Sequence, residues 1–384
     1  MESLSDDCQL LIIGSLRLKG QLKLWEATSH NASSRLPNNI IYHWQHKSSW
    51  ILDKKMLAYL EEHPEQLEGF LSGISGTVQQ LELQYIKSYE LQRWISYSFP
   101  SLRELSFSLD DDCEAIEELV HEVLVDIFPD LTSVQLSGKF YSKIIQKWSE
   151  LRRLDLSDCD CEPAAELSMC NFLKLEEITV QTDFLFQQFI DSTVVLPNLR
   201  TFCFYGEDKT DQVLNWIIDK RAEHISRISF NDSIWYCGTG TLEKMKHLRQ
   251  LTLVEDEGFE AHQLKALLKC FPQLRQLDLV NLQIWCSESE LWQTVSQCNS
   301  LQVLNIYGME LDDSFFDIGR YHMRSVLSKR STPLQLLCDN MDNPRMDKSF
   351  KHTNLIVKKG PLCDNIYIDV GYIKVEFDAL VTVQ

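Results

Sequence analysis

The stretch FPQLRQLDL, residues 271–279, decides the fold of this chain. It contains the pattern LxxLxL as LRQLDL (274–279), and nine further segments carry the same pattern with apolar replacements. They are VQQLEL (78–83), LRELSF (102–107), LTSVQL (131–136), LRRLDL (151–156), LEEITV (175–180), LRTFCF (199–204), ISRISF (225–230), LRQLTL (248–253) and LQVLNI (301–306). Successive copies start 20 to 29 residues apart, which is the period of a repeat protein.

Each copy predicts a short strand, because its fourth and sixth residues share one face while the third, fifth and seventh share the other. We expect the ten strands to form one continuous parallel sheet in sequence order. Helices are expected between strands, since Leu264, Leu267, Leu268 and Phe271 recur at helical spacing. The fourth-position leucines are expected in the core: Leu81, Leu105, Leu154, Leu251, Leu277 and Leu304.

The segments FPQLRQLDL and LRRLDLSDC, the second ending in Cys159, resemble the Cys-containing leucine-rich repeats of F-box proteins. The resemblance implies an α/β leucine-rich-repeat solenoid, with a curved parallel sheet and helices on its convex side. We assign the repeats to residues 78–330. Residues 331–384 are interpreted as a degenerate last repeat, STPLQLLCDN (331–340), and a C-terminal cap that includes two strands, NIYIDV (365–370) and YIKVEF (372–377).

The N-terminal stretch LSDDCQLLIIGSLRLKGQLKLW (4–25) places two acids before an apolar run. It resembles the F-box, a small helical module, which we assign to residues 1–45, followed by a helical connector or N-terminal cap at 46–77. The resemblance implies docking on the Skp adaptor of a Skp-cullin-F-box ubiquitin ligase. Because residues 10–13 are apolar in every helical direction, one side should remain for a partner. The predicted docking residues are Leu4, Leu10, Leu11, Ile13 and Leu16. Capping of the open end of the solenoid is the alternative role.

The polar positions of the strands form the second predicted surface, which would bind a protein target on the concave face. Its predicted residues are Asp155, Glu177, Tyr205, Arg227, Asn231, Asp278, Asn305 and Tyr307.

Composition narrows the class of function. A formal charge of −19 argues against nucleic acid and anionic membranes as partners. The twelve cysteines include no CxxC pair, so we expect reduced thiols, with neither a zinc site nor a disulfide framework. Motifs for hydrolases, phosphate loops and zinc proteases are absent from the sequence. We therefore expect no enzyme activity, no cofactor and no metal.

The acids Asp6 and Asp7 stand where a secretory signal would carry positive charge, so we expect a cytoplasmic or nuclear protein. Two functions remain open. The first is a substrate-recognition adaptor that binds the Skp adaptor and cullin complex at one end and a protein substrate through the repeats. The alternative is a non-enzymatic leucine-rich-repeat scaffold without a ligase.

Overall fold

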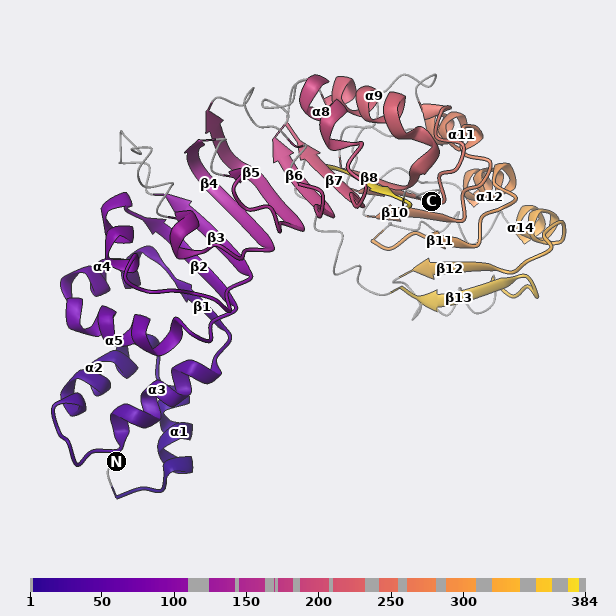
Figure 1. Ribbon diagram of the computed structural model, residues 1–384. Coiled ribbons are helices and arrows are strands. Elements are labelled where there is room, and N and C mark those ends of the chain that lie inside the picture. Colours follow the sequence, from indigo (N-terminus) through magenta and orange to yellow (C-terminus); the bar gives the residue numbers. More distant parts are fainter. Residues whose placement is uncertain are drawn as a thin grey trace. The chain divides into compact units, whose positions relative to one another are not determined.

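The computed structural model describes most of the chain (Figure 1). The described residues are 3–109, 124–141, 145–162, 169, 172–181, 187–206, 210–231, 242–254, 261–280, 288–308, 320–338, 350–360 and 372–379. Two compact units divide it, Met1–Ile178 and Thr179–Gln384, and each is described by itself. None of the described helices is long and apolar enough to cross a bilayer.

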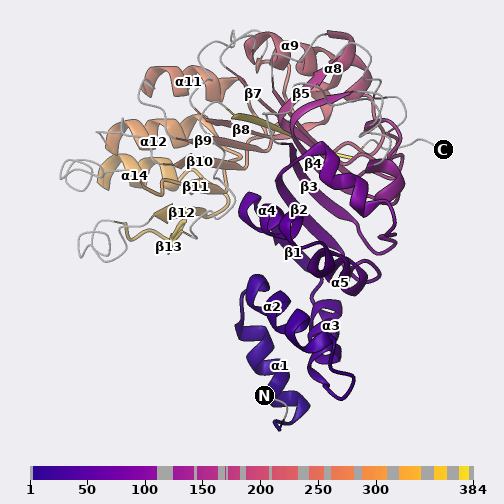
Figure 2. The ribbon, with the colours of Figure 1, turned by 90° about the vertical axis from the view of Figure 1, so that its left-hand side faces the viewer.

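The first unit begins with three helices that pack together, α1 (Asp6–Ser15), α2 (Leu18–Ser29) and α3 (Leu36–His46). Figure 2 shows α1 and α2 beside α3. A short strand β1 (Ser49–Leu52) and the helices α4 (Lys54–Glu62) and α5 (Pro64–Ile74) follow. These elements lie within residues 46–77, interpreted from the sequence as a helical connector or N-terminal cap; the strand β1 was not predicted. It pairs in parallel with the first repeat strand, Trp50 opposite Leu81.

The repeat strands of this unit run in parallel and in sequence order. They are β2 (Gln80–Ile86), β3 (Glu104–Leu109), β4 (Ser133–Tyr141) and β5 (Arg153–Glu162), with the 3-10 helix η1 (Ser88–Trp94) after β2; β6 (Glu177–Gln181) spans the unit boundary. Leu81 pairs with Leu105, Leu105 with Val134 and Val134 with Leu154. Equivalent residues of successive repeats therefore stack in register.

The backbone just before each strand ties one repeat to the next. The carbonyl of Gln79 accepts hydrogen bonds from the amides of Arg103 and Glu104, at 2.9 and 3.0 Å. The carbonyl of Arg103 in turn accepts from Thr132 and Ser133, both at 2.9 Å. This ladder satisfies backbone groups at the start of the strands, where the polar second and third positions of the repeat leave the buried core.

The second unit contains the remaining strands and helices. The strands are β7 (Thr201–Tyr205), β8 (Ile225–Asn231), β9 (Gln250–Val254), β10 (Gln276–Val280), β11 (Val303–Asn305), β12 (Leu334–Cys338), β13 (Leu355–Lys359) and β14 (Tyr372–Phe377). The helices are α8 (Gln187–Thr193), α9 (Thr210–Arg221), η5 (Ala222–His224), α11 (Ala261–Lys269), α12 (Glu288–Gln297) and α14 (Arg320–Leu327). In Figure 1 these helices lie on one side of the strands.

One strand departs from the expected sequential order. The order in this unit is β7-β14-β8-β9-β10-β11-β12-β13, so β14 separates two consecutive repeats. It runs antiparallel to both neighbours, with Val375 opposite Phe202 on β7 and Ile228 on β8. The prediction of a purely parallel and sequential sheet is therefore wrong at this place. The expectation that residues 372–377 cover the last repeat is also wrong, because the apolar face of β14 completes the middle of the unit.

The core confirms the fold class. All six leucines predicted to be buried are at most 2% exposed. The strand β12 falls within the predicted degenerate repeat and pairs in parallel with β11, while β13 adds a strand that the sequence did not predict. The helix α11 contains the predicted Leu264, Leu267 and Leu268. The chain is a leucine-rich-repeat protein with a small helical module ahead of the repeats. The strand predicted at 365–370 lies outside the described residues.

Candidate functional site

The first helix starts where the sequence places two acids. The hydroxyl of Ser5 caps α1 by accepting a hydrogen bond from the amide of Cys8 at 3.5 Å. Asp6 and Asp7 lie in the first turn, where negative charge stabilises the helix dipole. The apolar run that follows therefore lies within the helix and presents its side chains around the helix axis.

The outer side of α1 carries an exposed apolar surface. Leu11 is 76% exposed, Leu4 40% and Ile12 36%. Leu11 and Ile12 lie on α1, whereas Leu4 precedes the helix, just ahead of its N-cap Ser5. We call Leu4, Leu11 and Ile12 the α1 face. Among the predicted docking residues, Leu10 and Leu16 are half-buried. Ile13 is fully buried, so it is a core residue and leaves the docking set.

A buried glutamine fixes α1 relative to the next two helices. Gln21 on α2 donates from Nε2 to the carbonyls of Ile13 (3.0 Å) and Leu16 (2.9 Å). Its Oε1 accepts from the indole Nε1 of Trp44 on α3 at 2.7 Å. Both the Nε2 and the Oε1 of Gln21 are therefore hydrogen-bonded, as a buried polar side chain requires. The α1 face is thereby held away from the module core.

The N-terminal helices pack on α5 at two of its glycines. A Cβ added at Gly69 would lie 2.3 Å from Trp25, and one at Gly73 would lie 2.9 Å from Trp44. The absence of side chains at these positions lets both indoles approach the helix closely. Trp44 also meets the edge of Phe70 at 5.4 Å between ring centroids. The N-terminal helices therefore share an aromatic core with α5.

The polar strand face of the first unit contains two of the predicted target-binding residues. Asp155 on β5 is half-buried, and its Oδ1 accepts from the amide of Ser157 at 2.9 Å. Glu177, at the start of β6, is half-exposed and lies 3.8 Å from the guanidinium of Arg153. Both carboxylates remain accessible on the strand surface.

On the same face of the second unit, two predicted residues are already engaged by β14. The ring of Tyr205 stacks on Tyr372 at 4.4 Å between centroids. Arg227 lies 3.5 Å from the carboxylate of Glu376. Asn231 ends β8 opposite Val254, and its side chain lies outside the description. Tyr307 is half-exposed, and its amide donates to Asn305 Oδ1 at 3.1 Å.

The last two predicted residues form a buried polar cluster. Asp278 is 1% exposed and Asn305 0%. The Oδ2 of Asp278 accepts from Gln250 Nε2 (2.9 Å) and Thr252 Oγ1 (3.1 Å), while Oδ1 accepts from Asn305 Nδ2 (3.2 Å) and Gln276 Nε2 (3.0 Å). These bonds link β9, β10 and β11. The cluster joins three strands and is not an open surface, so Asp278 and Asn305 are wrong as exposed target-binding residues.

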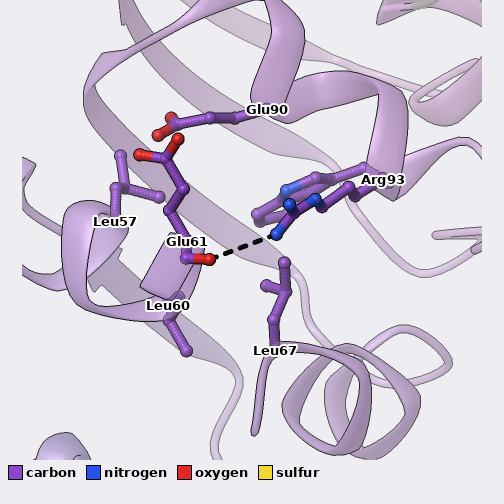
Figure 3. A pocket seen from close by; sticks show the side chains of 7 residues that line it. Leu57, Leu60, Glu61, Leu67, Glu90 and Arg93 are labelled. Carbon is purple, nitrogen blue, oxygen red and sulfur yellow. Dashed lines mark hydrogen bonds between the residues drawn. The ribbon is translucent and has the colours of Figure 1, made fainter. Parts of the chain in front are cut away.

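Two carboxylates meet at a small pocket between α4 and η1 (Figure 3). The carboxylates of Glu61 and Glu90 face each other, and the Nη1 of Arg93 donates to the carbonyl of Glu61 at 3.4 Å. Burial raises the pKa of Glu90. The hydrogen bond that the backbone amide of Lys87 donates to Glu90 opposes this shift, while the charge of Glu61 and a hydrogen bond between the two carboxyl groups raise the pKa further. Among the described residues, no three His, Cys, Asp or Glu side chains gather as a metal site would require.

Comparison with known proteins gives fold-level likenesses. No family model matches the chain, and no curated protein matches it in sequence. A crystal structure of the yeast Rad7 and Elc1 complex aligns at 14% identity over 80% of this chain and 90% of that chain, with a TM-score of 0.34. The leucine-rich-repeat protein LegL7 of Legionella pneumophila aligns at 15% identity over 68% and 85%, with a TM-score of 0.35. A TLR13 complex with single-stranded RNA aligns at 13% identity over 78% of this chain but only 37% of that chain, with a TM-score of 0.27.

Sequence reasoning missed Ile12 on the α1 face and the engagement of Tyr205 and Arg227 by β14. The polar Gln9, four residues before Ile13, is buried beside it on α1 and hydrogen-bonds Asn39 of α3 at 2.8 Å. A glutamine at that position could have indicated which side of the apolar run faces inward, but only with a partner such as Asn39 already known.

Proposed function

We propose that this protein is the substrate-recognition adaptor of a Skp-cullin-F-box E3 ubiquitin ligase. The N-terminal module binds the Skp adaptor through the α1 face, and the repeats bind a protein target. The mechanism is proximity: the ligase is held at the module, and lysines of the bound target are presented to the charged conjugating enzyme. The protein works in the cytoplasm or the nucleus.

The observation that carries the proposal is the exposure of the α1 face. Three apolar side chains are exposed there: Leu4 just before α1, and Leu11 and Ile12 on the helix, whose inner side is fixed by Gln21 and Ile13. Fully burying one such side chain stabilises a complex by about 1.5–3 kcal/mol. A partner helix laid on this face would cover apolar surface that the module itself cannot reach, since Gln21 holds α1 in place.

The accessible polar positions of the strands support target binding. Asp155, Glu177 and Tyr307 are the predicted residues that remain partly exposed and are not paired with β14. An aromatic side chain on an extended surface is a common anchor at protein interfaces. With a chain charge of −19, we propose a target surface that contains basic residues.

The scaffold function remains the second candidate because of the seat on α5. Gly69 and Gly73 accommodate Trp25 and Trp44, so the module packs on α5, directly ahead of the first repeat, and a capping role needs no adaptor. Capping alone explains the buried side of the module. It does not explain the exposed leucines of α1, which is why we favour the adaptor.

Reconstitution separates the two functions. Purified full-length protein is mixed with the Skp adaptor, and a known F-box protein is run in parallel as the positive control. The adaptor function predicts a one-to-one complex by size-exclusion chromatography with light scattering. Failure to bind under conditions where the control binds would leave the scaffold function in its place.

A further inference from the structure

The strand β14 fills a gap between two repeats that would otherwise lie next to each other. Five of its residues pair in register with β7, from Tyr372 opposite Tyr205 to Glu376 opposite Thr201. The other edge pairs with β8, from Ile373 opposite Phe230. Ile373 and Val375 are 0% exposed and Phe377 6%, whereas Tyr372, Lys374 and Glu376 are half-exposed. The gap therefore fits an extended segment whose alternate residues are apolar and buried.

Both ends of β14 are recognised by side chains of the neighbouring repeats. At the start, Tyr372 stacks on Tyr205. At the end, the ring of Phe377 lies 4.2 Å from the guanidinium of Arg221, and Asp378 lies 3.2 Å from Arg249. These contacts add specificity for an aromatic residue at each end to the backbone pairing that any strand could make.

The chain between Lys359 and Tyr372 is long enough to connect β13 to β14. Since β13 is six strand positions from β14, the distance along the sheet is roughly 29 Å at about 4.8 Å per strand. Thirteen residue steps separate Lys359 from Tyr372, and about 3.5 Å per step allows roughly 45 Å. Because β13 is parallel to its neighbour and β14 is antiparallel to β7, the end of β13 and the start of β14 lie at the same edge of the sheet. The departure of β14 would break its own pairing with β7 and β8. The other strand pairs of the unit would stay in place.

A buried cation lies beneath the end of β14. Arg221 is 3% exposed and donates to the carbonyls of Val194 (3.0 Å) and Leu199 (3.2 Å), while its Nε has no hydrogen-bond partner. Burial lowers the pKa of this guanidinium to about 10. The buried Nε without a partner destabilises the state in which β14 is in place. Departure of Phe377, which lies against the guanidinium, would expose Arg221 to water. This offsets part of the free energy that β14 contributes by burying its apolar residues.

We propose that the gap between β7 and β8 is a peptide-binding slot that β14 occupies as an internal ligand. Its external ligand is an extended segment of a partner protein that replaces β14, with apolar residues at three alternate positions and an aromatic residue as the last of them. The inference does not depend on the ligase function, because it follows from strand pairing in the second unit alone.

A native thiol reports occupancy of the slot. Cys203 on β7 lies directly opposite Lys374 of β14, and it is not in a disulfide. Directly opposed residues on antiparallel strands bring their Cβ atoms within reach of a disulfide. Full-length protein carrying Lys374→Cys should therefore form an intramolecular Cys203 disulfide with oxidised glutathione. If this crosslink does not form, β14 is not in the slot and the proposal fails.

The probe for external binding is a synthetic peptide with the sequence of residues 369–380 and cysteine in place of Lys374, supplied as its mixed disulfide with thionitrobenzoate. The Cys203 thiolate attacks the peptide sulfur, the new disulfide forms, and the thionitrobenzoate anion leaves as the coloured product. The matched control peptide has cysteine in place of Val375, whose side chain points into the core. Mass spectrometry of the digested adduct identifies the cysteine that reacted.

The slot predicts labelling of Cys203 by the first peptide and at least tenfold slower labelling by the control. Weakening the internal ligand with Val375→Ala should raise the labelling rate at least tenfold. Glu376→Ala, which removes the pair with Arg227, is a milder second variant, and circular dichroism melting checks that both variants are folded. Equal labelling by both peptides, or no labelling of Cys203 in any variant, would overturn the proposal.

Discussion

Substitution of Gly69 by alanine tests how the N-terminal module is held on α5. In an exposed helix interior, Gly→Ala stabilises by about 1 kcal/mol. Here the new Cβ would lie 2.3, 2.6 and 2.7 Å from three ring atoms of Trp25, far inside the ~3.5–4.0 Å optimum for carbon contacts. Overpacking of this kind costs about 1–3 kcal/mol, and Trp25 must also move from its place beside Trp44. We expect net destabilisation of about 1–2 kcal/mol.

The assay is thermal unfolding followed by circular dichroism, with Gly20→Ala on α2 as the matched control. A Cβ at Gly20 meets Leu16 at an ordinary 3.6 Å, so that variant should gain the usual helix stabilisation. For a unit of this size we expect Tm to fall by roughly 2–8 °C with Gly69→Ala and to rise slightly with Gly20→Ala. If both variants are equally stabilised, Trp25 does not pack against Gly69, and the proposed packing of the module on α5 is wrong.

Three further predictions concern other buried groups. Glu90→Gln should raise Tm near pH 7 and leave it unchanged near pH 4. The pKa of Glu90 is raised in the folded protein, so the stability of the wild type falls as the pH rises above the ordinary 4.5. A Tm difference between variant and wild type that is the same at all pH values would argue against this. Asp278→Ala should cost about 3 kcal/mol in denaturant unfolding, since the donors of Thr252 and Asn305 lose their acceptor; a neutral effect would contradict it. Leu154→Ala should cost about 2–5 kcal/mol by the same assay, and a cost under 1 kcal/mol would place this leucine outside the core.

The repeats could be predicted from sequence because their information is local. Each LxxLxL segment predicts its own strand and the residues that this strand buries. Stacking of the strands requires only the next copy along the chain. This is why Leu81 and Leu304, more than two hundred residues apart, were both assigned correctly to the core. The strand β12 was found in the same way from its degenerate copy of the pattern.

The position of β14 could not be predicted, because its pairing is not local. The alternation in YIKVEF indicates a strand, but nothing within those six residues names Phe202 and Ile228 as the residues opposite Val375. The same limit applies to Asp278. It occupies the fifth position of its repeat, as Asp155 does, yet Thr252 and Asn305 on the neighbouring strands enclose it in hydrogen bonds.

The side of α1 that faces outward was also beyond the sequence. The run Leu10–Ile13 is apolar all round the helix, so its periodicity does not distinguish the buried Ile13 from the exposed Leu11. Only the contacts of Gln9 and Gln21 with other helices settle the orientation. Deletion of residues 1–45 is a poor test of docking, because it would also expose the surface of α5 on which Trp25 and Trp44 pack.

The most direct test of the adaptor function is the affinity of the Skp adaptor for wild type, Leu11→Asp and the matched control Ile95→Asp. Leu11 is 76% exposed and Ile95 51%, and both belong to the first unit, but only Leu11 is on the α1 face. Isothermal titration calorimetry should show at least tenfold weaker binding for Leu11→Asp, equal to a loss of about 1.4 kcal/mol or more. Ile95→Asp should bind like wild type, and both variants should keep the wild-type Tm. Identical affinities for all three proteins would contradict docking through the α1 face.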